Sequence, residues 1–160
     1  MLKFTNYNIV FQEIPDEVTL AVNLSNCPNR CKGCHSPYLR EDTGRLLDDD
    51  SLMEIVNEYD GAITCVCFMG GDADPEEVER LSVLIRKRSR GALKTGWYSG
   101  KNCFPDCCSP LNFNYIKLGP YIEELGGLDS PTTNQRFYHV VNGEMIEEKA
   151  NQKWGTKKGG

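Results

Sequence analysis

The sequence has no apolar run long enough to cross a membrane. Its longest stretch without a charged residue covers 12 residues, 18–29, and is partly polar. A membrane helix needs about 20 apolar residues. The first residues, Met1 to Tyr7, also lack the apolar core of a signal peptide. We therefore expect a cytoplasmic protein that does not associate with membranes.

Positive charge is also scarce. The chain has 18 Lys and Arg against 23 Asp and Glu, for a net charge of −5 at pH 7. Contacts to nucleic-acid phosphates need clustered cations, so we expect no nucleic-acid partner. An apolar share of 39% with 15 glycines and 8 prolines excludes a disordered or collagen-like chain. The length of 160 residues predicts a single domain over 1–160.

Cysteine, by contrast, is abundant, with 8 in the chain. Disulfides are rare in a reducing cytosol, so a thiol-rich cytosolic chain indicates metal or redox chemistry. The cysteines form three groups, at positions 27, 31 and 34, at 65 and 67, and at 103, 107 and 108.

Apolar patterning predicts an α/β fold that begins and ends with a β-hairpin. Strand-like runs flank the turn residues 14–17 near the start, and two more flank Asn142-Gly143 near the end. Between the hairpins, predicted strands at 62–69, 93–98 and 115–118 alternate with predicted helices at 49–59 and 75–90. This alternation is typical of βαβ units around a parallel sheet. A closed eight-unit barrel takes about 250 residues, so we predict a partial, open β/α barrel.

The helix ends carry capping residues. Asp48, Asp49 and Asp50 supply cap and first-turn carboxylates for the helix over 49–59. For the helix over 75–90, we expect Asp74 and Glu77 to form a capping box.

Three cysteines lie in a polar loop with the spacing C-x3-C-x2-C, at Cys27, Cys31 and Cys34. In one interpretation, the three thiolates hold three irons of a [4Fe–4S] cluster and leave the fourth iron open to a small molecule. In a second, they form a zinc site together with His35. In a third, they are redox or buried thiols. The spacing favours the cluster.

A second motif, Gly70-Gly71-Asp72, ends the predicted strand at 62–69. Ligands of parallel α/β sheets bind at the carboxyl ends of the strands, and paired glycines let the backbone approach a ligand closely. Asp72 is expected either to accept a hydrogen bond from an ammonium group or to cap the next helix. A tight turn alone would also explain the glycines, but with the cysteine loop they outline one pocket.

Together these motifs resemble the signature of the radical S-adenosylmethionine family. The cysteine loop follows an early strand as in that family, and Gly70-Gly71-Asp72 is similar to its Gly-Gly-Glu motif, with a side chain shorter by one methylene. The segments 94–100, 115–121 and 128–136 resemble those of the glycyl-radical activases that serve anaerobic ribonucleoside-triphosphate reductase. Asn114 and the segment 103–108 depart from that pattern.

The resemblance implies a mechanism and a set of site residues. A reduced [4Fe–4S] cluster on Cys27, Cys31 and Cys34 would cleave S-adenosylmethionine, and the resulting 5′-deoxyadenosyl radical would take hydrogen from a glycine of the reductase. The protein would supply binding and orientation, so no acid or base is assigned. The resemblance implies that the cofactors contact Gly33, Cys34, His35, Gly70, Gly71 and Asp72.

The implied partners are the glycyl-radical subunit of the reductase and a low-potential electron donor such as flavodoxin or ferredoxin. Two alternatives stay open. One is a short radical enzyme that acts on a small molecule, and the other is a zinc-binding module without enzymatic activity. Cys65 and Cys67 are expected to be core residues. For Cys103, Cys107 and Cys108, incidental surface thiols and a second metal or redox site are both considered.

Overall fold

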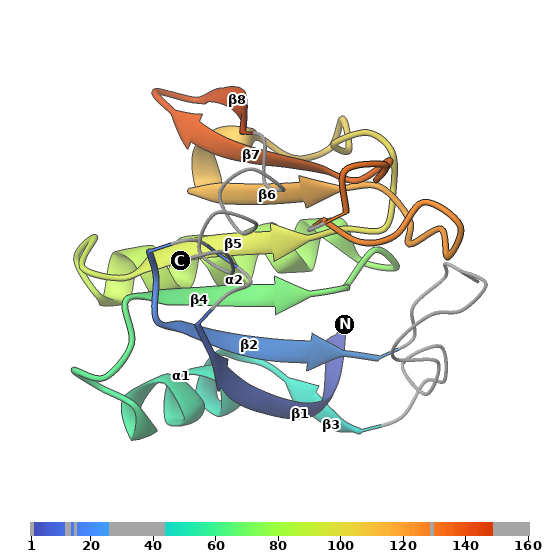
Figure 1. Ribbon diagram of the computed structural model, residues 1–160. Helices are drawn as coiled ribbons and strands as arrows, with labels where there is room; N and C mark the ends of the chain where they lie inside the picture. The colour runs from blue at the N-terminus through green and yellow to red at the C-terminus, as the bar shows by residue number, and fades with distance from the viewer. Residues whose placement is uncertain (1, 12–13, 15, 26–43, 129, 149–160) are drawn as a thin grey trace.

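In the computed structural model, the described residues form eight strands of one open, mixed sheet (Figure 1). The structure describes residues 2–11, 14, 16–25, 44–128 and 130–148. The strands are β1 (Leu2–Val10), β2 (Thr19–Leu24), β3 (Arg45–Leu47), β4 (Cys65–Met69), β5 (Lys94–Tyr98), β6 (Tyr115–Leu118), β7 (Arg136–Val141) and β8 (Glu144–Glu148). Their order in the sheet is β3-β1-β2-β4-β5-β6-β7-β8. The two outermost strands do not pair with each other, so the described strands form no closed barrel.

Four parallel strands, β2, β4, β5 and β6, make up the centre of this sheet. Antiparallel strands flank them on both sides, with β1 and β3 beyond β2, and β7 and β8 beyond β6. The predicted α/β class, the parallel centre and both terminal hairpins are therefore confirmed. The parallel arrangement places the carboxyl ends of β2, β4, β5 and β6 along one edge of the sheet.

Two helices, α1 (Asp49–Glu58) and α2 (Pro75–Arg88), cover the same face of the sheet (Figure 1). Their apolar stripes join one large core cluster with the strand residues that point to this face. Val66 and Phe68 of β4 are fully buried there, beside Leu52 of α1 and Val78 and Leu81 of α2. No helix among the described residues is both long and apolar enough to span a membrane.

The opposite face of the sheet has a smaller core, centred on Ile14 from the connection between β1 and β2. Ile14 is fully buried and packs against Cys65, Cys67 and Tyr115. A Cβ atom added to Gly96 of β5 would lie 2.9 Å from Ile14 Cδ1. The missing side chain at Gly96 thus makes room for Ile14, which fills this part of the face.

A buried carboxylate joins the starts of three parallel strands. Glu17, just before β2, accepts hydrogen bonds from Thr64 Oγ1 (2.6 Å), Lys94 Nζ (2.8 Å) and Tyr115 Oη (2.6 Å). Burial raises the pKa of Glu17, but the hydrogen bonds from Lys94, Thr64 and Tyr115 outweigh it, so the pKa lies below its usual value. The amino ends of β4, β5 and β6 are therefore held to the turn that precedes β2.

Three details differ from the sequence predictions. The first strand begins at Leu2, well before the predicted run, and β3 was not predicted because three residues are too few to show a period. The expected capping box of α2 is wrong: Asp74 is the N-cap residue by position but makes no side-chain cap bond. Glu77 instead pairs with Arg80 at 2.6 Å.

Candidate functional site

The Gly70-Gly71-Asp72 turn follows β4 at the carboxyl edge of the parallel strands. Both glycines have positive φ angles, 103° and 88°, a region that side chains disfavour. The Gly70 N–H donates to the Tyr98 carbonyl (3.0 Å), and Trp97 Nε1 donates to the Gly70 carbonyl (2.7 Å). The end of β5 therefore holds the turn in place.

Gly71 sits where two other elements meet. A Cβ atom at this position would lie 2.6 Å from Val78 Cγ2 and 2.8 Å from Leu24 Cδ1. Leu24 is the last residue of β2, and Val78 lies in the first turn of α2. Only a glycine lets the turn pack this closely against both. The turn after β4 is thus in contact with the end of β2, the strand that leads into the cysteine segment.

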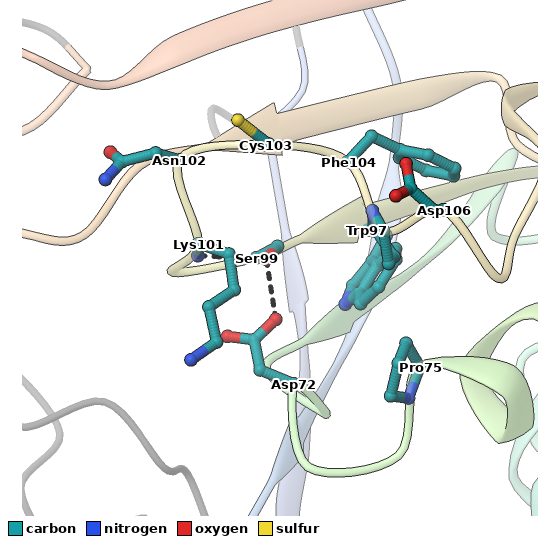
Figure 2. Close-up of a pocket in the computed structure, with 10 residues that line it drawn as sticks. Asp72, Pro75, Trp97, Ser99, Lys101, Asn102, Cys103, Phe104 and Asp106 are labelled. Atoms are coloured by element: carbon teal, nitrogen blue, oxygen red, sulfur yellow. Dashed lines mark hydrogen bonds between the residues drawn. The ribbon is translucent and has the colours of Figure 1, made fainter.

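Asp72 binds the loop that follows β5. Its Oδ1 accepts from Ser99 Oγ (2.6 Å) and its Oδ2 accepts from the Gly100 N–H (2.9 Å), as Figure 2 shows for the first of these bonds. Ser99 Oγ also accepts from the Lys101 N–H (3.1 Å). The N-cap residue of α2 is Asp74 and not Asp72. The contacts of Asp72 fix the turn after β4 to the loop after β5.

An open pocket of about 480 Å³ lies between this turn and the loop after β5 (Figure 2). Trp97 and Phe104 form an aromatic wall, with ring centroids 5.9 Å apart in an edge-on arrangement. The indole ring of Trp97 also stacks on Phe113 at 5.5 Å. The complete lining is Asp72, Pro75, Trp97, Ser99, Lys101, Asn102, Cys103, Phe104, Pro105 and Asp106.

The end of β6 adds a buried cation to the same edge. Lys117 Nζ donates to the Ser99 carbonyl (3.0 Å) and the Gly119 carbonyl (3.2 Å), and it lies 5.6 Å from the ring centroid of Tyr98. The Lys117 residue is only 8% exposed. The ends of β5 and β6 are thus joined by a lysine.

The segment that precedes β7 folds back on this edge. Asn134 Nδ2 donates to the Pro120 carbonyl (3.0 Å), and Gln135 Nε2 donates to the Gly119 carbonyl (3.4 Å). A Cβ atom at Gly119 would lie 3.1 Å from Gln135 Cα. The segments 115–121 and 128–136, which carried part of the resemblance, therefore contact each other at the carboxyl edge.

The structure places only part of the predicted site. Gly70, Gly71 and Asp72 lie together at the carboxyl edge, as expected. Cys27, Cys31, Cys34, Gly33 and His35 lie outside the described residues. Within the described residues, no group of three or more His, Cys, Asp or Glu side chains is arranged to hold a metal ion.

Comparison of this chain with protein-family models, curated proteins and solved structures found no match. Sequence reasoning did not single out Ser99, Gly100 or Lys117 as site residues. The signal for these residues is their position in the parallel strands. Ser99 and Gly100 follow β5, which pairs with β4, and Lys117 lies near the end of β6, which pairs with β5. The carboxyl ends of such strands converge at one edge.

The remaining cysteines separate clearly by burial. Cys65 and Cys67 are fully buried, so their predicted place in the core is confirmed, and burial raises the pKa of the Cys65 thiol. Cys103 and Cys107 are exposed, and Cys108 is partly buried. Cys107 Sγ and Cys108 Sγ lie 3.6 Å apart.

Asn114, one of the departures from the resemblance, has a structural role. Its Oδ1 accepts from the Thr95 N–H (2.9 Å), and its backbone N–H donates to the Thr95 carbonyl (2.8 Å). The residue thereby joins the starts of β5 and β6. An oxygen acceptor is all that this position needs, and asparagine supplies it.

Proposed function

We propose that this chain is a radical S-adenosylmethionine activase that generates the glycyl radical on anaerobic ribonucleoside-triphosphate reductase. One observation carries the proposal: the Gly70-Gly71 turn packs on Leu24 at the end of β2, immediately before the C-x3-C-x2-C segment. The cysteine segment follows β2 in the sequence, and the Gly70-Gly71 turn follows β4, which pairs with β2 in parallel. Parallel sheets bind ligands at the carboxyl ends of such strands.

The turn has properties that suit the aminoacyl end of such a cofactor. At Gly70, an added Cβ would lie 3.4 Å from the Leu24 carbonyl oxygen, which is an ordinary van der Waals contact, so the φ angle of 103° is what favours glycine there. The lack of a side chain at Gly70 and Gly71 lets a ligand approach the backbone of the turn closely. For the cluster, the donor set is three thiols, which suits iron and leaves one iron without a protein ligand.

A reduced cluster supplies the electron that cleaves the sulfonium of S-adenosylmethionine, and this chemistry belongs to the cofactor. The chain's own residues hold the site in shape. Gly71 fits between Leu24 and Val78, and Asp72 ties the turn to Ser99 at 2.6 Å. We assign Asp72 as a positioning residue, because both of its carboxylate oxygens accept hydrogen bonds from the loop after β5.

An open sheet suits a macromolecular substrate. The described strands leave the sheet unclosed, and both helices lie on one face. A glycine-bearing loop of the reductase would approach the other face at the carboxyl edge. We further propose a flavodoxin or ferredoxin as the electron donor and a cytoplasmic location.

The decisive experiment is anaerobic reconstitution with iron and sulfide, followed by metal analysis. The proposal predicts a bound [4Fe–4S] cluster and formation of 5′-deoxyadenosine after addition of a strong reductant. Cys31→Ser should lose both, while Cys107→Ser, at an exposed position outside the pocket lining, should retain both. If the protein binds zinc through Cys27, Cys31 and Cys34 and binds no iron, the enzymatic hypothesis is wrong and a zinc-binding module is favoured.

The identity of the substrate needs a second measurement. Mixed with the glycyl-radical subunit of the reductase, the reconstituted protein should produce a glycyl signal in electron paramagnetic resonance. Formation of 5′-deoxyadenosine without any protein radical would contradict the activase assignment. It would favour a radical enzyme that acts on a small molecule.

A further inference from the structure

Two adjacent cysteines in the loop after β5 direct their thiols toward the same point. Cys107 Sγ and Cys108 Sγ lie 3.6 Å apart. Cys107 is exposed, so solvent and dissolved ions reach the pair. Neither thiol takes part in the candidate site described above. The separation of the sulfur atoms indicates what the pair can bind.

A disulfide within the pair does not suit this geometry. A disulfide brings its sulfur atoms to about 2.05 Å and usually joins Cα atoms roughly 4.4–6.8 Å apart. Adjacent residues across a trans peptide have Cα atoms only about 3.8 Å apart, so a disulfide here would be strained and easily reduced. Two thiolates on one tetrahedral zinc ion, each about 2.3 Å from the metal, lie about 3.8 Å from each other. The observed separation is close to this second value.

The surroundings of the pair favour a cation. The carboxylates of Glu79 and Glu76 lie near enough to Cys108 to act on its thiol electrostatically. Those carboxylates belong to the first turns of α2, and Glu79 Oε2 accepts from the Ser109 N–H (2.6 Å), so the helix and the loop are in contact. The negative charge of these carboxylates attracts a cation to this part of the surface.

We propose that Cys107 and Cys108 form a bidentate site for a soft divalent cation of the zinc class. Binding of the cation forms two metal–sulfur bonds and releases two protons, one from each thiol, with no change of oxidation state. Two positions of the tetrahedron are left for water or for donors of another molecule. The proposal does not depend on the proposed function, since it uses none of the cluster cysteines.

The thiol pair lies beside the start of α2. Cys108 Sγ lies 3.4 Å from the Pro75 carbonyl, at the first residue of the helix. The same loop begins at Ser99 and Gly100, which hold Asp72. A cation on the thiol pair would therefore lie on the loop that lines the pocket, next to the first turn of α2.

The probe for the test is Cd²⁺, because its thiolate complexes absorb in the ultraviolet. The protein is the full chain with Cys27, Cys31 and Cys34 replaced by serine. In this background the thiols left are the buried Cys65 and Cys67 and the three of the loop. We expect about one Cd²⁺ per chain, held by the thiol pair. Cys107→Ser and Cys108→Ser should each abolish the charge-transfer absorption, whereas Cys103→Ser should leave it unchanged.

Two results would overturn the proposal. In the first, Cd²⁺ binding is unaffected by Cys107→Ser and Cys108→Ser. In the second, Cys103→Ser abolishes binding as well, which would mean that the pair alone is not the site. Cys107 is exposed, so its replacement is expected to leave the circular dichroism spectrum and the folding of the chain unchanged. Failure of cluster assembly on the native chain would leave this test unaffected, because the two sites share no cysteine.

Discussion

The close fit of Gly71 gives a quantitative prediction for the candidate site. Substitution by alanine places a Cβ atom 2.6 Å from Val78 Cγ2 and 2.8 Å from Leu24 Cδ1. The φ angle of 88° adds a backbone cost of about 1–2 kcal/mol for a residue with a side chain. Overpacking of a buried site costs about 1–3 kcal/mol. Gly71→Ala should therefore lower the free energy of unfolding by about 2–5 kcal/mol.

Two other glycines separate these contributions. Gly61 has a φ angle of 81°, and a Cβ added there would have no neighbour within 4 Å, so Gly61→Ala should show only the backbone cost. Gly70→Ala, whose Cβ would meet nothing closer than 3.4 Å, should cost about as much. The excess cost of Gly71→Ala over Gly61→Ala then measures the overlap with Val78 and Leu24. We expect an excess of about 1–3 kcal/mol.

Urea denaturation of the apoprotein under anaerobic conditions, followed by circular dichroism, is the suitable assay. With a slope of about 2 kcal/mol per molar urea, the excess corresponds to a shift of the midpoint by roughly 1 M. In the Gly71→Ala background, Val78→Ala should cost less than it does alone, because it removes the overlapping methyl group. If Gly71→Ala costs no more than Gly61→Ala, the close packing between the turn, β2 and α2 is refuted. After reconstitution, Gly61→Ala should cleave S-adenosylmethionine normally, whereas Gly71→Ala should be impaired.

Further predictions concern the contacts that frame the sheet. Glu17→Ala should destabilise the protein by about 2–4 kcal/mol at pH 7, mainly because it leaves the buried Tyr115 hydroxyl without its acceptor. In that background, Tyr115→Phe should cost less than it does alone, as thermal unfolding will show. Because the pKa of Glu17 is lowered in the folded protein, its carboxylate contributes fully to the free energy of unfolding above about pH 4.3, its pKa in the unfolded chain. This contribution is lost as the pH falls through the folded pKa. The difference in stability between the native chain and Glu17→Ala should therefore shrink in acid. Asn114→Asp should leave the unfolding temperature nearly unchanged, whereas Asn114→Ala should cost about 1 kcal/mol, because only alanine removes the oxygen acceptor. Ser99→Ala removes one hydrogen bond to Asp72 and so loosens the turn. Its loss in the rate of S-adenosylmethionine cleavage, expressed as a free energy, should exceed its loss in the free energy of unfolding. Equal losses of free energy would contradict the positioning role of Asp72.

The sequence predicted the helices and strands whose apolar residues recur with a regular period. Apolar periodicity located both helices and the central strands, and Asn142-Gly143 located the last hairpin, where both residues have positive φ angles. The three residues of β3 show no period, and their pairing with β1 depends on contacts distant in the chain. The role of Ile14 was equally hidden, because nothing near it in sequence indicates that Gly96 leaves space for it.

At the candidate site, the sequence indicated the two glycines but not the contacts that require glycine at these positions. Positive φ at Gly70 follows from its position after a strand, but the contact of Gly71 with Leu24 needs the packing of β2, β4 and α2. The bond between Asp72 and Ser99 joins residues 27 positions apart. The capping prediction for Asp74 was wrong for the same reason: local pattern does not specify which partner a carboxylate finds.

The two margins of the sheet restrict how this protein can associate with others. An unpaired outer strand offers its backbone groups to any extended chain, which invites aggregation. Here β3 has only three residues, and β8 carries Glu144, Glu147 and Glu148 among its five. A short strand at one margin and like charges at the other both discourage an added strand. Both outer strands of the described sheet therefore disfavour edge-to-edge pairing, and we expect a partner to be recognised by side chains and loops instead of by strand addition.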